Sequence, residues 1–322
     1  MDEYGLPGLG FPSIKIPMAV LCHSKTQREL LVEPELLIGR SPNCGLRIQE
    51  PYVSAQHAAL RWGGSRWEVK DLGSRNGTFL NGVRLEVGKA YFVAKGAELA
   101  FGSDGEVWQL QDDAAPPAMA IPLDGGDPLV PENDVIGVPS SNNPEASIFR
   151  DADGFWKLET IDGDRTVLEH HKLFQVAGRP WRFASPDVLG PTSSTLQSSG
   201  STPVSLRFQV SRDEEHVDLR AEQGDLVVDL GTRSHNYLLL TLARARREDE
   251  KSGFAEPACG WVHQEDLLSA LHITSTQLNI DVFRIRQQFA RAGLPGVVNV
   301  IERRPRSKQL RLGFATFSIE VL

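Results

Sequence analysis

The chain has 322 residues, of which 40% are apolar and 24% are charged, and its formal net charge is −8. This composition supports ordinary hydrophobic cores and excludes a wholly disordered chain, and the length favours about two or three domains. The sequence contains no apolar run of about 18 residues and does not begin with the basic stretch and apolar core of a secretory signal, so we expect a cytoplasmic protein with no membrane partner.

Linker composition divides the chain into three units. Residues 112–117 are rich in Asp, Ala and Pro, and residues 188–203 form a Ser/Gly-rich, flexible linker. Between residues 113 and 202, thirteen acidic side chains outnumber six basic ones, whereas the end of the chain from Arg284 onward carries eight basic residues and two acidic ones. The basic end fits an acidic partner such as nucleic acid, and equally an ordinary solvated face.

The first unit, residues 18–112, is predicted to be all-β. Short strand-like runs such as 35–38, 57–62 and 67–71 are separated by turn residues. Asn81-Gly82 lies between two short apolar runs and indicates a hairpin, because both central positions of a type I′ turn need a positive φ. Evenly spaced short strands are typical of a β-sandwich.

Three loop motifs follow one another in this unit: Gly39-Arg40, Ser54-Ala-Gln-His57 and Ser74-Arg75-Asn76-Gly77-Thr78, with Asn81-Gly82 after them. In this order and spacing they resemble the forkhead-associated (FHA) family over nearly the whole unit. The resemblance implies a β-sandwich whose loops at one end bind a phosphothreonine peptide. One departure is Ala55, where the family often has Arg.

The resemblance also assigns the site residues. It implies that Arg40 and Ser54 bind the phosphate, that Arg75 adds a phosphate contact and that Asn76 holds the peptide backbone. It implies structural support from Gly39, His57, Gly77, Asn81 and Gly82, with His57 bracing the loop from inside. Charge-assisted donors on a rigid sandwich suit a phosphate dianion, since Arg offers a planar fork. The alternative is a degenerate sandwich used only for packing.

The middle unit, residues 118–187, looks like a shortened copy of the first. Ile136-Gly137 is similar to Ile38-Gly39, and Val138 would then replace the phosphate-binding Arg. We therefore expect a degenerate FHA-like β domain that binds no phosphate, with a separate small β domain as the alternative. We interpret Glu169-His170-His171 as a solvated turn rather than a metal site, since adjacent residues of a strand face opposite ways.

The third unit, residues 204–316, is predicted to be an α+β winged helix-turn-helix. Three strand-like runs at 206–210, 216–219 and 225–230 come first. A first helix is expected at 236–247, with Ser234 as its cap, and a short second helix near 265–271. A third helix is expected to start after Ser275 or Thr276 and to run to Ala292. Runs 297–302 and 309–312 then predict a hairpin around a basic turn.

This unit resembles the OmpR-type winged-helix DNA-binding family, mostly through its core pattern. The resemblance implies that the third helix enters the major groove and that the hairpin touches DNA as a wing. Carried over, it implies DNA contacts by Asn279, Arg284, Arg286, Arg303, Arg304, Arg306 and Lys308. Asp281 and Phe283 depart from the family, which commonly places polar residues facing DNA there, and the paired arginines could instead form ion pairs within the domain.

The sequence therefore predicts a multidomain signalling adaptor that couples Ser/Thr-kinase phosphorylation to DNA binding and transcriptional regulation. Its expected partners are a phosphothreonine-containing protein, either a Ser/Thr kinase or a kinase substrate, and double-stranded DNA. The alternative is a phosphopeptide-binding scaffold whose winged helix contacts protein. We expect no enzyme, because the chain has no GxxxxGK loop, GxSxG elbow or HExxH pair, and we expect no cofactor, metal or small-molecule substrate.

Overall fold

The computed structural model describes residues 18–103, 105–151, 154–186, 203–294 and 296–322. The chain divides into two compact units, Met1–Pro117 and Ala118–Leu322. None of the helices in the described ranges is long and apolar enough to span a lipid bilayer. Almost all of the expected linker at 188–203 lies outside the described residues. The expected linker at 112–117 is held to the first unit, since Ala114 accepts a hydrogen bond of 3.1 Å from the Trp67 ring.

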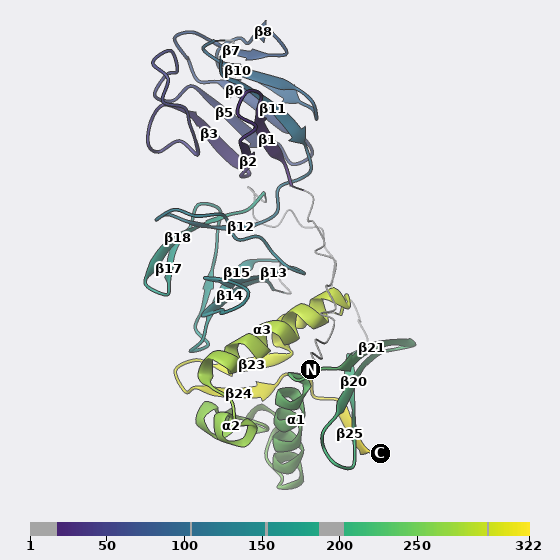
Figure 1. Ribbon diagram of the computed structural model, residues 1–322. Helices are drawn as coiled ribbons and strands as arrows, with labels where there is room; N and C mark the ends of the chain where they lie inside the picture. The colour runs from purple at the N-terminus through teal and green to yellow at the C-terminus, as the bar shows by residue number, and fades with distance from the viewer. Residues whose placement is uncertain (1–17, 104, 152–153, 187–202, 295) are drawn as a thin grey trace, which may run out of the picture. The chain divides into compact units, whose positions relative to one another are not determined.

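The first unit is a sandwich of two sheets (Figure 1). One sheet has the order β2-β1-β11-β10-β7-β8: β1 Val20–His23, β2 Glu29–Leu31, β7 Thr78–Leu80, β8 Val83–Arg84, β10 Glu98–Phe101 and β11 Val107–Asp112. The other has the order β4-β3-β5-β6-β9: β3 Glu35–Gly39, β4 Leu46–Arg47, β5 Ala58–Trp62, β6 Trp67–Asp71 and β9 Ala90–Val93. Alternate residues of both sheets fill one core, which includes Leu21, Leu99, Leu60 and Trp67. The predicted β-sandwich is confirmed.

The middle domain, which begins the second unit, is also a pair of sheets around its own core. The smaller sheet has the order β12-β18-β17: β12 Met119–Pro122, β17 Leu173–Val176 and β18 Arg179–Ala184. The larger is the meander β13-β14-β15-β16: β13 Val135–Val138, β14 Ala146–Arg150, β15 Trp156–Thr160 and β16 Arg165–Val167. Ile136, Ile148 and Trp181 are among the residues that meet in the core between them.

The strand register corrects the expected alignment of the middle domain with the first unit. Val138 pairs with Ala146, as Ile38 pairs with Ala58, so Val138 corresponds to Ile38 and not to Arg40. Ser140 therefore takes the place of Arg40. The alignment from sequence was wrong by two residues because Ile136 and Val138 are both apolar, so either one could be matched with Ile38.

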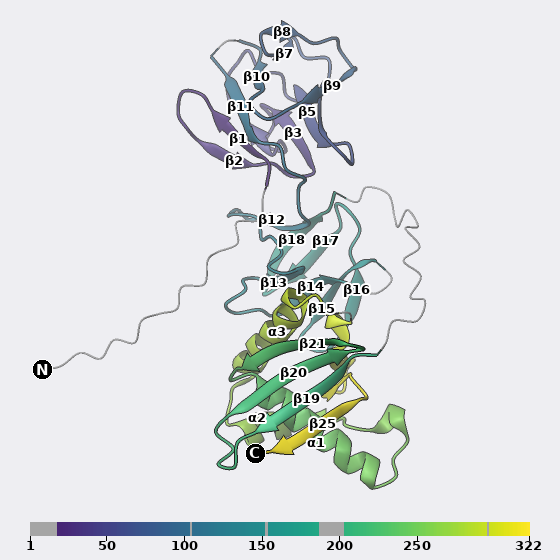
Figure 2. The ribbon, with the colours of Figure 1, turned by 90° about the vertical axis from the view of Figure 1, so that its right-hand side faces the viewer.

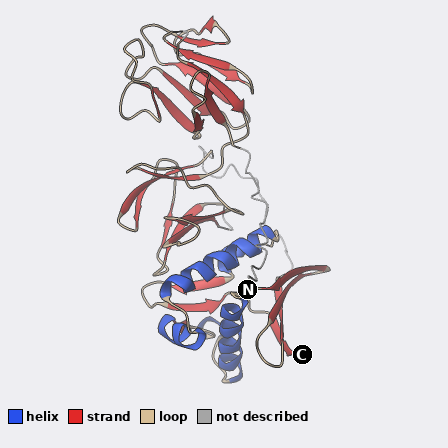
Figure 3. Cartoon of the chain, in the orientation of Figure 1, coloured by secondary structure: helices blue, strands red, loops and turns tan. Residues whose placement is uncertain are grey.

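The C-terminal domain has the expected order of strands and helices (Figure 3, helices in blue). Its strands are β19 Ser205–Val210, β20 Val217–Gln223, β21 Leu226–Thr232, β22 Val262–His263, β23 Ile301–Arg304, β24 Gln309–Leu312 and β25 Phe317–Val321. Its helices are α1 Asn236–Lys251, α2 Gln264–Leu271 and α3 Ser275–Arg291, with short 3-10 turns η1 Glu256–Ala258 and η2 Val297–Asn299. Beyond the predicted domain end at 316, β25 pairs in parallel with β19 to complete a four-stranded sheet (Figure 2).

Several local expectations for this domain were wrong. Helix α1 begins after His235, without a side-chain cap from Ser234. Helix α3 is capped by Thr274, whose hydroxyl accepts from the Gln277 amide, so the helix starts at Ser275 and not after Ser275 or Thr276. Residues 297–299 form a 3-10 turn rather than a strand, and the hairpin strand starts at Ile301.

The buried core of the C-terminal domain is built from residues that range from Val204 to Leu312.

Candidate functional site

The three motif loops of the first unit meet on one segment, Tyr52–Ser54. The Arg40 amide donates to the Ser54 carbonyl at 2.9 Å. From the third loop, the Arg75 amide donates to the Ser54 hydroxyl at 3.0 Å, and the Asn76 side-chain amide donates to the Tyr52 carbonyl at 2.7 Å. The fold therefore brings together all four residues predicted to bind a phosphopeptide.

The donors at this end of the sandwich are left open for an anion. Arg40 and Arg75 are exposed, and Ser54 and Asn76 are half-buried. Arg40 uses its Nε for the Val53 carbonyl at 3.3 Å, which fixes the guanidinium while its two terminal amino groups remain for a ligand. Because the Ser54 hydroxyl accepts from a backbone amide, its own proton is free to be donated to a phosphate oxygen.

His57 is fully buried and links the loops from inside, as expected. Its Nδ1 accepts from the Ser54 amide at 3.1 Å, and its Nε2 lies 3.1 Å from the Gly77 carbonyl. An amide can only donate and a carbonyl can only accept, so the ring is neutral with its proton on Nε2. Burial lowers the pKa of His57, which favours this neutral form.

Asp71 is a support residue that the sequence interpretation missed. It is 1% exposed and accepts hydrogen bonds from the amides of Gly73 and Ser74 at 2.8 and 2.9 Å, and from the hydroxyls of Ser74 and Thr78 at 2.6 Å each. Burial by itself would raise the pKa of Asp71, but the bonds from Ser74, Thr78 and Gly73 hold it below its ordinary value. Asp71 thereby shapes the loop that carries Arg75 and Asn76.

Steric constraints explain why glycine stands at the positions expected to support the loops. A Cβ on Gly39 would lie 2.4 Å from the Ala55 carbonyl oxygen, so this position keeps β3 close to the second loop. Gly77 has φ of +89°, and a Cβ there would lie 2.6 Å from Nε of Arg84. Asn81 and Gly82 have φ of 51° and 78°, which confirms the predicted hairpin turn between β7 and β8.

The corresponding end of the middle domain lacks these loops. Only residues 139–145 connect β13 to β14, whereas residues 40–57 connect β3 to β5. The Glu145 amide donates to the Val138 carbonyl as the His57 amide donates to Ile38, so Glu145 takes the place of His57. This end therefore has Ser140 and an acidic residue where the first unit has Arg40 and His57.

Helix α3 of the C-terminal domain packs against the larger sheet of the middle domain. Figures 1 and 2 both show α3 beside β13 to β15. Phe283 is 1% exposed and forms a small cluster with Val135 and Phe149. Gln287 donates to Glu132 at 2.9 Å. Phe283 therefore does not face outward, as its place in the DNA-binding pattern implied; it packs against another domain.

The residues predicted to contact DNA fall into two groups. Arg284, Arg304, Arg306 and Lys308 are exposed. Arg286 is 1% exposed, and Arg303 and Asn279 bond to each other at 3.0 Å, with the Arg303 side chain 6% exposed. Asp281, expected to face DNA, is buried and accepts from Gln277 at 2.8 Å, and burial raises its pKa.

The buried group converges on Glu159 of the middle domain. Arg286 donates to one carboxylate oxygen at 2.6 Å and Arg165 to the other at 2.7 Å, while Nε of Arg303 lies 3.9 Å away. Arg303 also donates to the Ile161 carbonyl. Burial by itself would raise the pKa of Glu159, but Arg286, Arg165 and Arg303 hold it below its ordinary value. Arg286 therefore forms an ion pair, as the alternative to DNA contact suggested, but its partner lies in another domain and not within its own.

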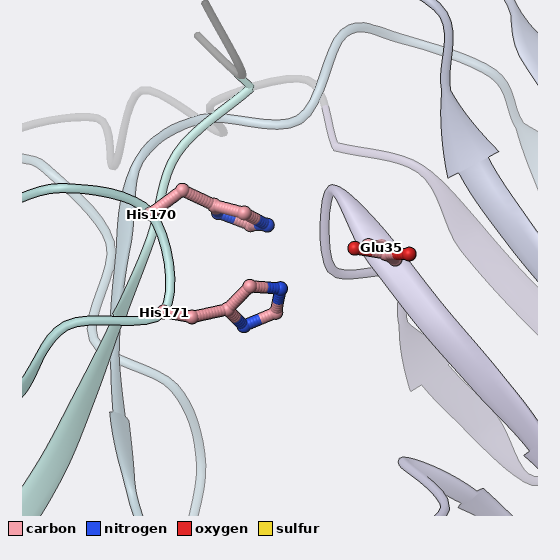
Figure 4. Close-up of side chains that lie close together, drawn as sticks. All are labelled: Glu35, His170 and His171. Atoms are coloured by element: carbon pink, nitrogen blue, oxygen red, sulfur yellow. The ribbon is translucent and has the colours of Figure 1, made fainter.

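His170 and His171 lie in a turn before β17, as expected, but their rings do not face opposite ways (Figure 4). The ring centroids are 3.9 Å apart, with the planes tilted by 50°. The alternation rule failed because it holds for extended strands, whereas His171 has φ of 67°. His170 accepts from the Ser185 amide at 3.1 Å through Nδ1.

Comparison with known proteins agrees with the geometry of the first unit. The family model of the FHA domain matches residues 36–102. FhaB of Mycobacterium tuberculosis, described as FHA domain-containing, is 40% identical over 76 residues, which are 22% of this chain and 49% of FhaB. The glycogen accumulation regulator GarA of Mycolicibacterium smegmatis is 37% identical over 75 residues, 23% of this chain and 46% of GarA. The chain thus spans about half the length of these relatives.

Solved structures of FHA domains match a similar share of the chain. A domain from a study of phosphothreonine-dependent FHA interactions matches 29% of this chain and 95% of its own, with 24% identity and a TM-score of 0.27. The FhaA FHA domain, solved with an intracellular domain of another protein, matches 28% of this chain and 97% of its own, with 26% identity and a TM-score of 0.25. The family-model match and the curated relatives identify the region 36–102 as an FHA domain.

Proposed function

We propose that this protein is a phosphothreonine-dependent signalling adaptor. The observation that carries the proposal is the convergence of the Arg40, Ser54, Arg75 and Asn76 loops on the segment Tyr52–Ser54. Two exposed guanidinium groups and one hydroxyl at the end of a rigid sandwich match a phosphate dianion. Binding, rather than catalysis, is the activity we propose for the chain.

Arg40→Ala tests this proposal directly. Charge-assisted hydrogen bonds of about 1.5–3 kcal/mol each are lost, so affinity for a phosphothreonine peptide should fall at least tenfold. Arg61→Ala is the matched control, since Arg61 is equally a surface arginine but its side chain is paired with Glu68. Calorimetry against a phosphothreonine peptide library measures the effect. Equal binding of phosphorylated and unphosphorylated peptides by the parent chain would disprove the function.

We propose DNA binding by the C-terminal domain as the output of the adaptor. Arg304, Arg306 and Lys308 are exposed on the hairpin that an OmpR-type winged helix would use as its wing, and Arg284 is exposed on α3. The test uses a fragment of residues 203–322, which contains its own core. Replacing the three hairpin residues with Ala in this fragment should lower its affinity for specific and random DNA sequences alike. The log–log salt slope should drop by about one unit for each phosphate contact removed.

Arg284→Ala should instead reduce the preference between DNA sequences, because base contacts from the helix carry discrimination. Fluorescence anisotropy of the fragment at several salt concentrations decides between the two roles. A folded fragment without salt-dependent DNA affinity at low salt would replace this output with the alternative, a scaffold whose winged helix contacts protein. The packing of Phe283 and Arg286 of α3 against the middle domain favours that alternative.

A further inference from the structure

The surface of α3 that meets the middle domain contains part of the predicted DNA-reading group. Asn279, Val282 and Arg286 of α3 and Arg303 of the hairpin line the junction, opposite Glu145, Ser147 and Glu159–Ile161. Along β13 to β15, Val135, Ser147, Phe149 and Glu159 alternate with residues of the inter-sheet core such as Ile148, so they lie on the outer face of the larger sheet, and α3 covers that face. The helix face that carries Asn279 and Arg286 is therefore occupied by another domain of the same chain.

The charges at this junction resemble those between a protein and a nucleic-acid backbone. A carboxylate oxygen of Glu159 accepts from Arg286 at 2.6 Å, as a phosphate oxygen would. The middle of the chain supplies the acidic partner, with thirteen acidic and six basic residues between positions 113 and 202. The domain that docks on α3 is thus acidic, as DNA is.

The docked state leaves donors unused. Within the described part of the chain, the Nε groups of Arg286 and Arg303 are buried and have no hydrogen-bond partner. One carboxylate serves three guanidinium groups, because Arg165 takes its second oxygen at 2.7 Å. A row of phosphates offers more acceptors than a single carboxylate, so DNA could satisfy these arginines better.

We propose that the middle domain competes with DNA for α3 within the same molecule. The middle domain occupies the face of α3 that would read DNA, and it must undock before the helix enters a groove. This inference rests on the proposed DNA-binding function. Of the seven residues predicted to contact DNA, Arg284 and the three exposed hairpin residues stay accessible in the docked state, which allows weak binding with little sequence preference. Apparent affinity is reduced by the fraction of molecules that are undocked.

Two substitutions in the full chain test the competition. Glu159→Gln removes the charge that holds Arg286 and Arg303, and Ser147→Trp adds bulk at a buried position of the junction. Asp124→Asn is the matched control, because it removes one acidic charge from the same domain at an exposed pair with Arg179. We expect both junction variants to bind duplex DNA at least tenfold more tightly than the parent chain, and the control to bind like the parent.

Hydrogen exchange shows whether undocking, rather than unfolding, causes the increase in DNA affinity of the junction variants. The variants should exchange faster in the junction loop 161–164, while strands β13 to β16 stay protected. By reciprocity, excess duplex DNA should raise exchange at loop 161–164 of the parent chain. Loss of protection throughout the middle domain in both variants would overturn the inference.

The outcomes separate this inference from the function on which it rests. If the parent chain and both junction variants bind DNA equally well, the competition is refuted and DNA binding stands. If the control gains as much as the junction variants, net charge and not docking sets affinity, and the competition is again refuted. If no form binds, including residues 203–322, the DNA-binding function fails and the competition fails with it.

Discussion

Asp71→Asn tests whether a buried carboxylate holds the phosphopeptide loops in place. The substitution preserves shape but removes the charge that accepts four hydrogen bonds of 2.6–2.9 Å. Asparagine keeps one acceptor for the amides of Gly73 and Ser74, and those two bonds weaken by about 1 kcal/mol each when the acceptor becomes neutral. Its amino group then faces the hydroxyls of Ser74 and Thr78, which must rotate away. We expect a total loss of about 2–4 kcal/mol of unfolding free energy.

Urea unfolding of residues 1–117 at pH 7 measures this loss. Asp113→Asn is the control, since Asp113 accepts one bond, from the exposed Lys95 amide at 2.9 Å, and should cost under about 1 kcal/mol. The variant should also bind a phosphothreonine peptide less tightly, because Asp71 positions the loop that carries Arg75 and Asn76. A loss of under about 1 kcal/mol for Asp71→Asn would refute the bracing role.

The pH dependence gives a second check with a definite sign. The folded structure holds the pKa of Asp71 below its ordinary value, so its contribution is fully present above the unfolded value of about 3.9 and is lost as the pH falls through the folded value. The difference in stability between the parent unit and Asp71→Asn should therefore be constant from about pH 7 to 5 and narrow below about pH 4. A stability difference that stays constant below about pH 4 would contradict the lowered pKa of Asp71 in the folded state.

Two further predictions concern residues that support the first and last domains. Gly39→Ala should destabilise the first unit by at least about 1 kcal/mol more than Gly82→Ala in urea unfolding, because a Cβ on Gly39 would lie 2.4 Å from the backbone carbonyl oxygen of Ala55, whereas a Cβ on Gly82 would meet nothing within 4 Å. Arg246→Met should lower the stability of residues 203–322 by about 2–4 kcal/mol in thermal unfolding, since the buried guanidinium donates to Glu250, Glu256 and the Leu312 carbonyl; an unchanged melting temperature would contradict this.

The sequence determined which loops meet at one end of the first unit. Arg40, Ser54, Arg75 and Asn76 lie on loops whose spacing is set by short strands, so motif order predicted which side chains meet. The Asn81-Gly82 turn followed from backbone preference alone. Asp71 escaped notice because its four donors come from a loop that must first fold around it, and an aspartate at a strand end has no distinctive local pattern.

The tertiary structure alone decided the register of the middle domain and the surroundings of α3. Val138 and Ile136 are both apolar and lie on the same face of a strand, so only pairing with Ala146 distinguished them. The pattern of α3 showed an apolar stripe for its own core, but could not show that Phe283 and Arg286 pack against another domain. Contacts such as Arg286 with Glu159 join residues 127 positions apart, and no local periodicity encodes which distant surface will cover a helix.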